Sequence, residues 1–398
     1  MLADADRAWL AASAESLDMD NSLAHEVVPR LAAAGLFGLG VPREWGGQGG
    51  DVWDGVEAIA AVAGESLTAA FTFWGQRAFI ENLLHSPNTV LRERWLPPLL
   101  AGTHAGAAGL SNAMKFLGGI EALGITARPA ASGWRLQGSI PWCTNLRPDG
   151  FVAAAAVALP QGARPVVAAL VSGRAGLTRS DDLDLIALRA SNTASLGIDG
   201  LLLEPADLIH EDAGAFLPRV RPAFLGLQCA LSIGLARSAL ATARRSGGAG
   251  REVLHEPVRA QRAALDAATA SLREGLADGR FVAQPAALFR LRLALADVVQ
   301  QALLLELQAG GGRAYHRDQP LSFARRWREA AFIPIVTPSV TQLLGALARQ
   351  AEAAPSGTGS TSGHMLVRPV TPMGPATPAV SAPDPVDRPS PRSQGSGA

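Results

Sequence analysis

The sequence is poor in several residue types, and each shortage excludes a class of protein. Only two cysteines, Cys143 and Cys229, occur in 398 residues, and they form neither a disulfide framework nor a metal-binding pattern. Lysine occurs once, at Lys115, so almost every basic side chain is an arginine. The formal net charge is +0, which argues against a surface that binds nucleic acid by neutralising its phosphates.

Long apolar runs are also missing. The longest, such as 151–159, ends at a proline and falls far below the ~18 residues that a membrane-spanning helix needs. The N-terminal stretch contains Asp4 and Asp6 and lacks the basic-then-apolar layout of a signal peptide. Hydrophobic residues make up 48% of the chain, so we expect most of it to fold. We therefore predict a cytoplasmic protein that binds neither nucleic acid nor a membrane.

Common catalytic motifs are absent as well. The chain has no Gly-x-Ser-x-Gly elbow and no paired-carboxylate motif. His210, His255 and His316 are isolated, without the spacing of a metal site, and we predict no metal. The glycine-rich stretch 35–50 lacks the Lys-Ser/Thr of a phosphate-binding loop, so we interpret it as a structural turn.

The sequence does contain a clear order of helical and strand-like segments. Helical periodicity covers 1–105 and returns over 213–353, and short strand-like runs separated by turn residues fill 106–212. We predict an α+β protein with an N-terminal all-α domain, a middle β-barrel or sandwich domain and a C-terminal four-helix bundle. The paired prolines 97 and 98 should end one helix, and 224–243 should form a long apolar one. The Pro-, Ser- and Gly-rich tail, 354–398, should be disordered.

The most informative stretch runs from Leu305 to Ser339. A helix with apolar residues at helical spacing must stop at the three glycines 310–312, because glycine removes side-chain support and invites positive φ. The layout resembles the C-terminal signature of acyl-CoA dehydrogenases. The residues that carry this resemblance are Gln308, Gly311-Gly312, Tyr315, Arg317-Asp318, Pro320, Arg328-Glu329-Ala330 and the segment 335–339.

The middle segment adds further points of similarity to the same family. Trp142, Thr144 and Asn145 resemble its Trp-x-Thr-Asn element, Leu110 and Ser111 stand where it has a Leu-Thr pair, and 188–193 matches its Arg-Gly/Ala-Ser-x-Thr turn. The resemblance implies an acyl-CoA dehydrogenase-like fold. It also implies a flavin whose ring lies against Trp142, since a flavin needs an apolar plate and hydrogen bonds near its reactive edge.

The resemblance implies FAD rather than FMN, because 308–312 matches the element that receives the adenine half of FAD from a second subunit. A homodimer or homotetramer is therefore implied. The family's Arg-x-x-Phe-Gly is missing here, and Arg244, Arg245 or Arg251 could meet phosphate or form a solvated loop. The full predicted cofactor-binding set is Leu110, Ser111, Trp142, Thr144, Gln308, Gly311, Gly312 and Ser339.

The catalytic base stays unassigned. Thr337 stands where the family has its catalytic glutamate, and a hydroxyl is too weak a base to take the α proton of an acyl thioester. Some members carry the glutamate on the first long helix of the bundle, at a position that falls near Phe224 here. Glu306 and Glu329 are nearby in sequence, but each also fits a structural role.

Three functions remain open on this basis. The first is a flavin-dependent oxidoreductase that acts on CH–CH groups of an acyl thioester or a similar small molecule and is linked to an electron-transfer flavoprotein. The second is a two-component flavin-dependent monooxygenase that uses reduced flavin from a flavin reductase together with oxygen. The third is a catalytically degenerate homologue that only binds flavin.

Overall fold

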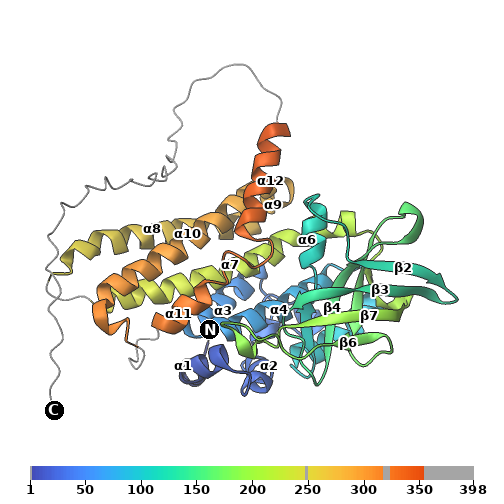
Figure 1. Ribbon diagram of the computed structural model, residues 1–398, viewed down its shortest axis with the longest axis horizontal. Helices are drawn as coiled ribbons and strands as arrows, with labels where there is room; N and C mark the ends of the chain where they lie inside the picture. The colour runs from blue at the N-terminus through green and yellow to red at the C-terminus, as the bar shows by residue number, and fades with distance from the viewer. Residues whose placement is uncertain (1, 247–249, 317–322, 354–398) are drawn as a thin grey trace, which may run out of the picture. The chain divides into compact units, whose positions relative to one another are not determined.

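The computed structural model describes residues 2–246, 250–316 and 323–353. Residues 1–353 form one compact unit in which helices, strands and helices follow one another along the chain (Figure 1). This order confirms the predicted α+β class, while the boundaries of the three predicted domains stay predictions. The predicted disordered tail lies outside the described residues, as do Arg317, Asp318 and Pro320 of the C-terminal signature.

The N-terminal helices are closed by side-chain caps that the sequence supplies. Asp51 accepts the N–H of Trp53, while its own N–H donates to Asp54, so that α3 starts with a capping box. Ser66 caps α4 in a similar way, and α4 is buried along nearly its whole length. The helices of this part are α1 (Asp4–Met19), α2 (Ala24–Ala33), α3 (Val52–Glu65), α4 (Leu67–Leu84) and α5 (Thr89–Leu100).

The sequence predicted that the paired prolines end a helix, and this prediction is wrong for α5. Pro97 and Pro98 lie inside its last turn, and the helix continues to Leu100. Their carbonyl groups still accept hydrogen bonds from the N–H groups of Ala101 and Thr103. Two prolines in the final turn therefore remove donors without leaving the acceptors of that turn unpaired.

The middle part consists of two four-stranded sheets that enclose their own apolar core. One sheet has the order β1-β4-β5-β8 and the other β2-β3-β7-β6. The strands are β1 (Ala105–Ala108), β2 (Ile125–Ala130), β3 (Gly133–Cys143), β4 (Phe151–Val157), β5 (Val166–Val171), β6 (Leu177–Arg179), β7 (Ala194–Leu203) and β8 (Leu208–His210). A short helix, α6 (Ser111–Leu117), follows β1.

The sequence of β4 is a continuous apolar run instead of an alternating one, and its position between two cores explains why. Phe151, Ala153 and Ala155 face the core between the sheets, whereas Val152 and Ala154 belong to the larger core that includes the helices. Both faces of the strand are therefore covered, and every residue in it is buried. The sheet that contains β4 joins the β part to the helices.

The C-terminal part is built on three long helices, α7 (Ala213–Arg245), α8 (His255–Ala277) and α10 (Pro285–Gly310). The short helix α9 (Arg280–Ala283) links the last two, and α11 (Phe323–Ala330) and α12 (Val340–Ala353) pack against α10. α7 starts well before the predicted residue 224 and passes through Pro218 and Pro222, because packing of its buried residues stabilises it.

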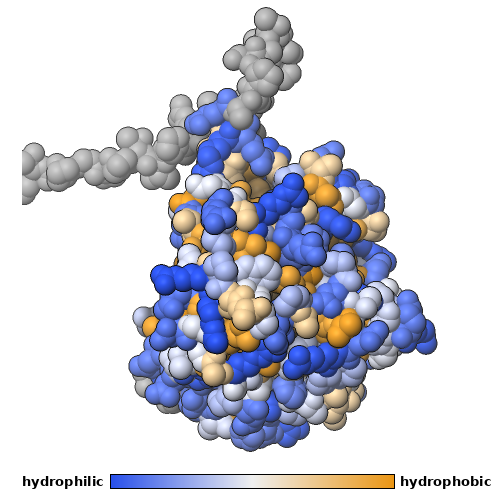
Figure 2. All heavy atoms as spheres, turned by 90° about the vertical axis from the view of Figure 1, so that its right-hand side faces the viewer, coloured by the Kyte–Doolittle hydropathy of each residue, from blue (hydrophilic) through white to orange (hydrophobic). Residues whose placement is uncertain are grey.

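α7 lies at the centre of the described unit. It is long and apolar enough to cross a membrane by composition alone, but 89% of its most apolar window is buried, as in the core helix of a folded protein. In Figure 1 it runs from the side of the β-sheets toward α8 and α10. Figure 2 shows the face at the β-sheet end, where apolar patches lie among polar side chains.

Candidate functional site

Trp142 lies near the end of β3, with its side chain 56% exposed. The two residues that follow, Cys143 and Thr144, are both buried. The pKa of the Cys143 thiol is raised to about 12 by burial, so this cysteine remains protonated. The hydroxyl of Thr144 donates to the carbonyl of Ser191 at 3.2 Å. Of this element, the indole of Trp142 is the surface that a ligand can contact.

Leu110 and Ser111 lie beside the same strand. Leu110 is fully buried, whereas Ser111 is half-buried at the first position of α6. A Cβ atom on Gly109 would come within 2.8 Å of Cδ1 of Ile140, so the turn between β1 and α6 packs on β3 two residues before Trp142. The structure thus brings the two predicted ring-binding elements to one end of the β part.

The turn 188–193 has a direct part in this arrangement, which the sequence analysis had missed. Ser191 offers its carbonyl to both Thr144 and the N–H of Asn145, and its hydroxyl lies 2.7 Å from that of Thr193. Two residues of the turn, Leu188 and Asn192, have left-handed backbones. No local signal in the sequence links it to residues more than 40 positions earlier.

Phe224 and Thr337, the two positions considered for a base, lie close to each other. Gln228, one turn after Phe224 on α7, donates its Nε2 to the carbonyl of Thr337 at 3.0 Å. Trp74 of α4 donates its indole N–H to the carbonyl of Phe224 at 3.3 Å, and their rings meet edge to face at 5.1 Å. In the described part of the chain, none of these hydrogen bonds or ring contacts involves a carboxylate.

A buried cation fixes the segment that contains Thr337. Arg292 of α10 donates its Nε to Gln228 at 3.1 Å and its Nη2 to the carbonyl of Ile333 at 2.7 Å. Burial lowers the pKa of Arg292, and it raises the pKa of the neighbouring Cys229 to about 11. This arrangement positions the 333–337 backbone against α7 and α10.

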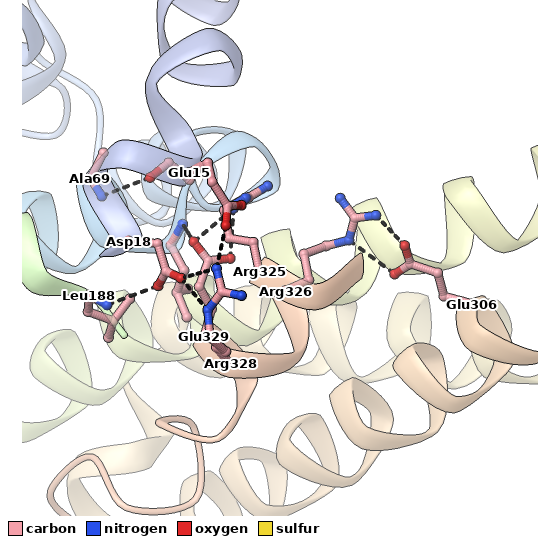
Figure 3. A network of polar contacts seen from close by, with 11 residues as sticks. Glu15, Asp18, Ala69, Leu188, Glu306, Arg325, Arg326, Arg328 and Glu329 are labelled. Atoms are coloured by element: carbon pink, nitrogen blue, oxygen red, sulfur yellow. Dashed lines mark hydrogen bonds and ion pairs between the residues drawn. The ribbon is translucent and has the colours of Figure 1, made fainter. Parts of the chain in front are cut away.

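Glu306 and Glu329 are both held in buried ion pairs with arginines of α11. Figure 3 shows Arg326 of α11 directed at Glu306 of α10, and the Nε of Arg326 donates to that carboxylate at 3.0 Å. Glu329 accepts two bonds from Arg325, at 2.7 and 2.8 Å, and one from the N–H of Leu67 at 3.0 Å. Both carboxylates are buried and structurally engaged, so neither is placed to act as a base.

The same network extends to the N-terminal helix. Arg328 donates to Asp18 at 2.9 Å and to Glu15 at 2.6 Å, and Asp18 also accepts the N–H of Leu188 (Figure 3). Burial raises the pKa of Asp18 and also that of Glu329, the latter to about 7. α1, α4, α11 and the turn 188–193 are therefore tied together by charge, and this links segments from all three predicted domains.

Three other predicted cofactor residues, Gln308, Gly311 and Gly312, lie at the end of α10 and just after it. Gln308 is exposed on the last turn of α10, and Gly311 follows with a φ of +58°. A Cβ atom on Gly311 would come within 3.1 Å of Arg251, whereas the position of a Cβ on Gly312 is open. Any side chain at 311 would therefore be strained and would press on Arg251.

A cavity of about 360 Å³ opens beside this glycine turn. It lies between the end of α7, the start of α8 and the end of α10, and its walls are mostly apolar. Four arginines, Arg244, Arg251, Arg259 and Arg262, line it together with His255. Arg259 and Arg262 also pair with Glu256 and Asp266 on exposed turns of α8. The sequence had pointed to Arg244 and Arg251, but not to the two arginines of α8.

The two groups of predicted residues do not meet within one chain. Thr144 packs on Gly75, and the adjacent Trp74 contacts Phe224, whereas the cavity is lined by Ala243. Phe224 and Ala243 are 19 positions apart on α7, about 28 Å at the rise of an α-helix. Ser339 belongs to the first group, where its side chain and that of Gln342 cap the start of α12.

The residues present fit the two ends of an FAD molecule. At the β end, the exposed indole of Trp142 offers an apolar surface on which a flavin ring can stack. At the bundle end, an apolar cavity with several guanidinium groups matches an adenine nucleotide with its diphosphate. Within the described residues there is no group of three or more His, Cys, Asp or Glu side chains that could hold a metal ion.

Comparisons with known proteins bear on the fold of the chain. Residues 3–103 match the family model "Acyl-CoA dehydrogenase, N-terminal domain". Mitochondrial isovaleryl-CoA dehydrogenase of Pongo abelii is 26% identical over 219 residues, which cover 52% of this chain and 51% of that protein. The chain thus spans about half the length of the first curated relatives that it matches.

Solved structures show the same fold. Butyryl-CoA dehydrogenase from Megasphaera elsdenii superposes with a TM-score of 0.73 at 20% identity, covering 86% of this chain and 94% of that one. Dibenzothiophene monooxygenase from Paenibacillus superposes with a TM-score of 0.64 at 19% identity, covering 85% and 94%. Structures with this fold have been solved with FAD, in PigA, and with FMN, in KijD3. The predicted acyl-CoA dehydrogenase-like fold is confirmed.

Proposed function

We propose that the chain is a member of the acyl-CoA dehydrogenase superfamily, which its fold and the match over residues 3–103 support, and that it is an oxidoreductase that binds FAD. The observation that carries the proposal is the cavity of about 360 Å³ beside Gln308, Gly311 and Gly312. FMN has no adenine nucleotide to place there, so an arginine-lined cavity at this position supports FAD as the cofactor. The flavin supplies a redox centre that exchanges electrons with a substrate, a protein partner or oxygen.

Residues at two separate places in the chain would bind the two halves of FAD. Trp142 would hold one face of the ring system, and Leu110 and Thr144 would support that surface from beneath. Arg251 and Arg244 would bind phosphate oxygens by charge-assisted hydrogen bonds, and Gly311 and Gly312 would allow the nucleotide to approach the backbone. Since these places lie at different ends of α7, each FAD would need two copies of the chain.

The surroundings of Phe224 and Thr337 favour a particular type of reaction. Abstraction of an α proton from a thioester needs a general base, such as a carboxylate. In the described part of the chain, the contacts around these two residues are made by Trp74, Gln228 and Arg292 instead. We therefore infer a monooxygenase type of reaction. One oxygen atom of O2 enters the substrate, the other leaves as water, and a flavin reductase supplies the two electrons.

The dehydrogenase reaction remains the second candidate, because curated relatives that match the chain are acyl-CoA dehydrogenases. In that case a small molecule such as an acyl thioester would give a proton and a hydride, and an electron-transfer flavoprotein would take the electrons onward. The base would have to come from outside the contacts described around Thr337.

An absorbance spectrum of the purified protein, followed by anaerobic addition of a panel of acyl-CoAs, tests both candidates. We expect flavin bands that no acyl-CoA bleaches, and oxygen-dependent consumption of a reductant once a flavin reductase is added. Bands that bleach with an acyl-CoA would instead establish the dehydrogenase. Protein that binds no flavin, even after incubation with FAD, would overturn the proposal as a whole.

A further inference from the structure

The turn that carries Trp142 is held from behind by two buried amide side chains. Gln76 of α4 and Asn145 are both fully buried. Asn145 has a φ of +61°, in the left-handed region that asparagine tolerates better than most residues. Its Nδ2 donates to Oε1 of Gln76 at 2.8 Å and to the carbonyl of Gly106 at 2.8 Å. One side chain thus joins the Trp142 turn to both α4 and β1.

The orientation of the Gln76 amide is determined by its other partners. Its Nε2 donates to the carbonyl groups of Leu99, at 2.9 Å, and His104, at 3.0 Å. Its Oε1 also accepts the N–H of Gly106 at 2.6 Å. The oxygen of Gln76 must therefore face Asn145, and Asn145 must present its NH2 group to it. A reversed amide at either residue would place like groups against each other.

Backbone contacts hold the same turn from the opposite side. The N–H of Asn145 donates to the carbonyl of Ser191 at 3.0 Å, and the N–H of Leu146 donates to that of Asn192 at 3.0 Å. On the α4 side, a Cβ atom on Gly75 would come within 3.1 Å of the methyl group of Thr144. The turn is therefore fixed between α4 and 188–193, and only Trp142 projects from it to solvent.

This arrangement leaves the side-chain oxygen of Asn145, Oδ1, without a hydrogen bond in the described part of the chain, although that atom is buried. A buried acceptor without a donor is destabilising, so an asparagine here is a poor choice for stability alone. What asparagine provides is a left-handed backbone together with two donors at a fixed place.

We propose that the Gln76–Asn145 pair positions the Trp142–Thr144 turn for cofactor binding. The inference rests on the proposed function, because it assigns the pair to the same flavin site. Both amides are positioning residues: they are buried behind the turn and act through the placement of Trp142. Flavin affinity should therefore depend on α4, which itself lies on the far side of the turn from the exposed indole.

The test uses Asn145→Asp, which keeps the shape of the side chain and its tolerance of positive φ. The change replaces the NH2 group by an oxygen that faces two acceptors, Oε1 of Gln76 and the carbonyl of Gly106. We expect flavin binding, titrated on protein freed of flavin, to weaken about tenfold or more. Amide hydrogen exchange over residues 142–146 should become faster at the same time.

Asn88→Ala is the matched control. The amide of Asn88 also joins distant segments, since it donates to the carbonyl groups of Ala206 and Leu208, but it caps α5 away from Trp142. This variant should lose thermal stability while it keeps the flavin affinity of the wild type and its exchange over residues 142–146. If it lost flavin equally at an equal loss of stability, the special role of Asn145 would be overturned.

Gly75→Ala keeps the test decisive if Asn145→Asp fails to fold. It adds a methyl group 3.1 Å from Thr144 and 3.3 Å from Cβ of Asn145 without removing a hydrogen bond. We expect the same weaker binding and faster local exchange. Wild-type affinity and exchange in a folded variant would overturn the positioning role alone. A wild-type protein that binds no flavin would overturn the proposed function together with this inference.

Discussion

At the scale of single residues, Glu329 is the side chain whose protonation most directly links pH to stability. It is completely buried, and burial raises its pKa to about 7, well above the ordinary value of 4.5. Between these two pH values the folded protein binds a proton that the unfolded chain releases. The contribution of Glu329 to stability is therefore fully present below about pH 4.5 and is lost as the pH rises to about 7.

We predict that Glu329→Gln flattens the dependence of the melting temperature on pH between about pH 5 and pH 7. Glutamine cannot titrate, so the decrease with rising pH should become smaller than in the wild type. Below about pH 5 the two melting temperatures should lie close together, because Glu329 is then protonated and, like glutamine, carries no charge. Thermal scans across this pH range measure both effects.

Glu256→Gln serves as the control, because Glu256 forms an exposed ion pair with Arg259 on α8. Loss of this pair should change neither the melting temperature nor its dependence on pH noticeably. A Glu329→Gln variant with the wild-type slope would show that Asp18, whose pKa is also raised by burial, dominates the titration.

At the scale of elements, the sequence predicted the series of helices and strands because periodicity is a local signal. Trp142, Gln308 and Gly311 also stand in recognisable local patterns, and their role in cofactor binding stays a prediction. Contacts between distant segments carry no such signal: Gln76 meets Asn145 across 69 positions and Leu67 meets Glu329 across 262. The predicted end of α5 and the predicted start of α7 were wrong, because both helices contain prolines whose local effect is outweighed by packing.

The ends of α7, α8 and α10 make a second testable element, the arginine-lined cavity. We predict that Arg251→Ala weakens binding of FAD about tenfold and leaves binding of FMN unchanged, since only FAD carries a nucleotide that reaches this cavity. Titration of flavin-free protein with each cofactor gives the two affinities.

Arg273→Ala is a suitable control for this experiment, because Arg273 also lies on α8 but stacks over the ring of Trp53 instead of lining the cavity. Equal losses of FAD and FMN affinity in Arg251→Ala would contradict the assignment of the cavity to the nucleotide half.

At the scale of the whole molecule, the separation of the two predicted half-sites has a consequence for assembly. The turn of Trp142 packs near Phe224 of α7, and the cavity beside Gly311 is lined by Ala243 of the same helix. These two positions on α7 are about 28 Å apart. If each FAD joins the β end of one chain to the bundle end of another, then a dimer contains two sites, and each site takes one half from each chain.

This arrangement predicts complementation between two defective variants. Trp142→Ala damages the ring end, Arg251→Glu damages the nucleotide end, and a homodimer of either should retain little FAD. In a mixed dimer both defects fall in one site, so the other site is built from two intact halves. Subunits unfolded and refolded together should therefore bind up to one FAD per mixed dimer, measured by flavin absorbance after size-exclusion chromatography. A site made within a single chain would give no recovery on mixing, because every copy would keep its own defect.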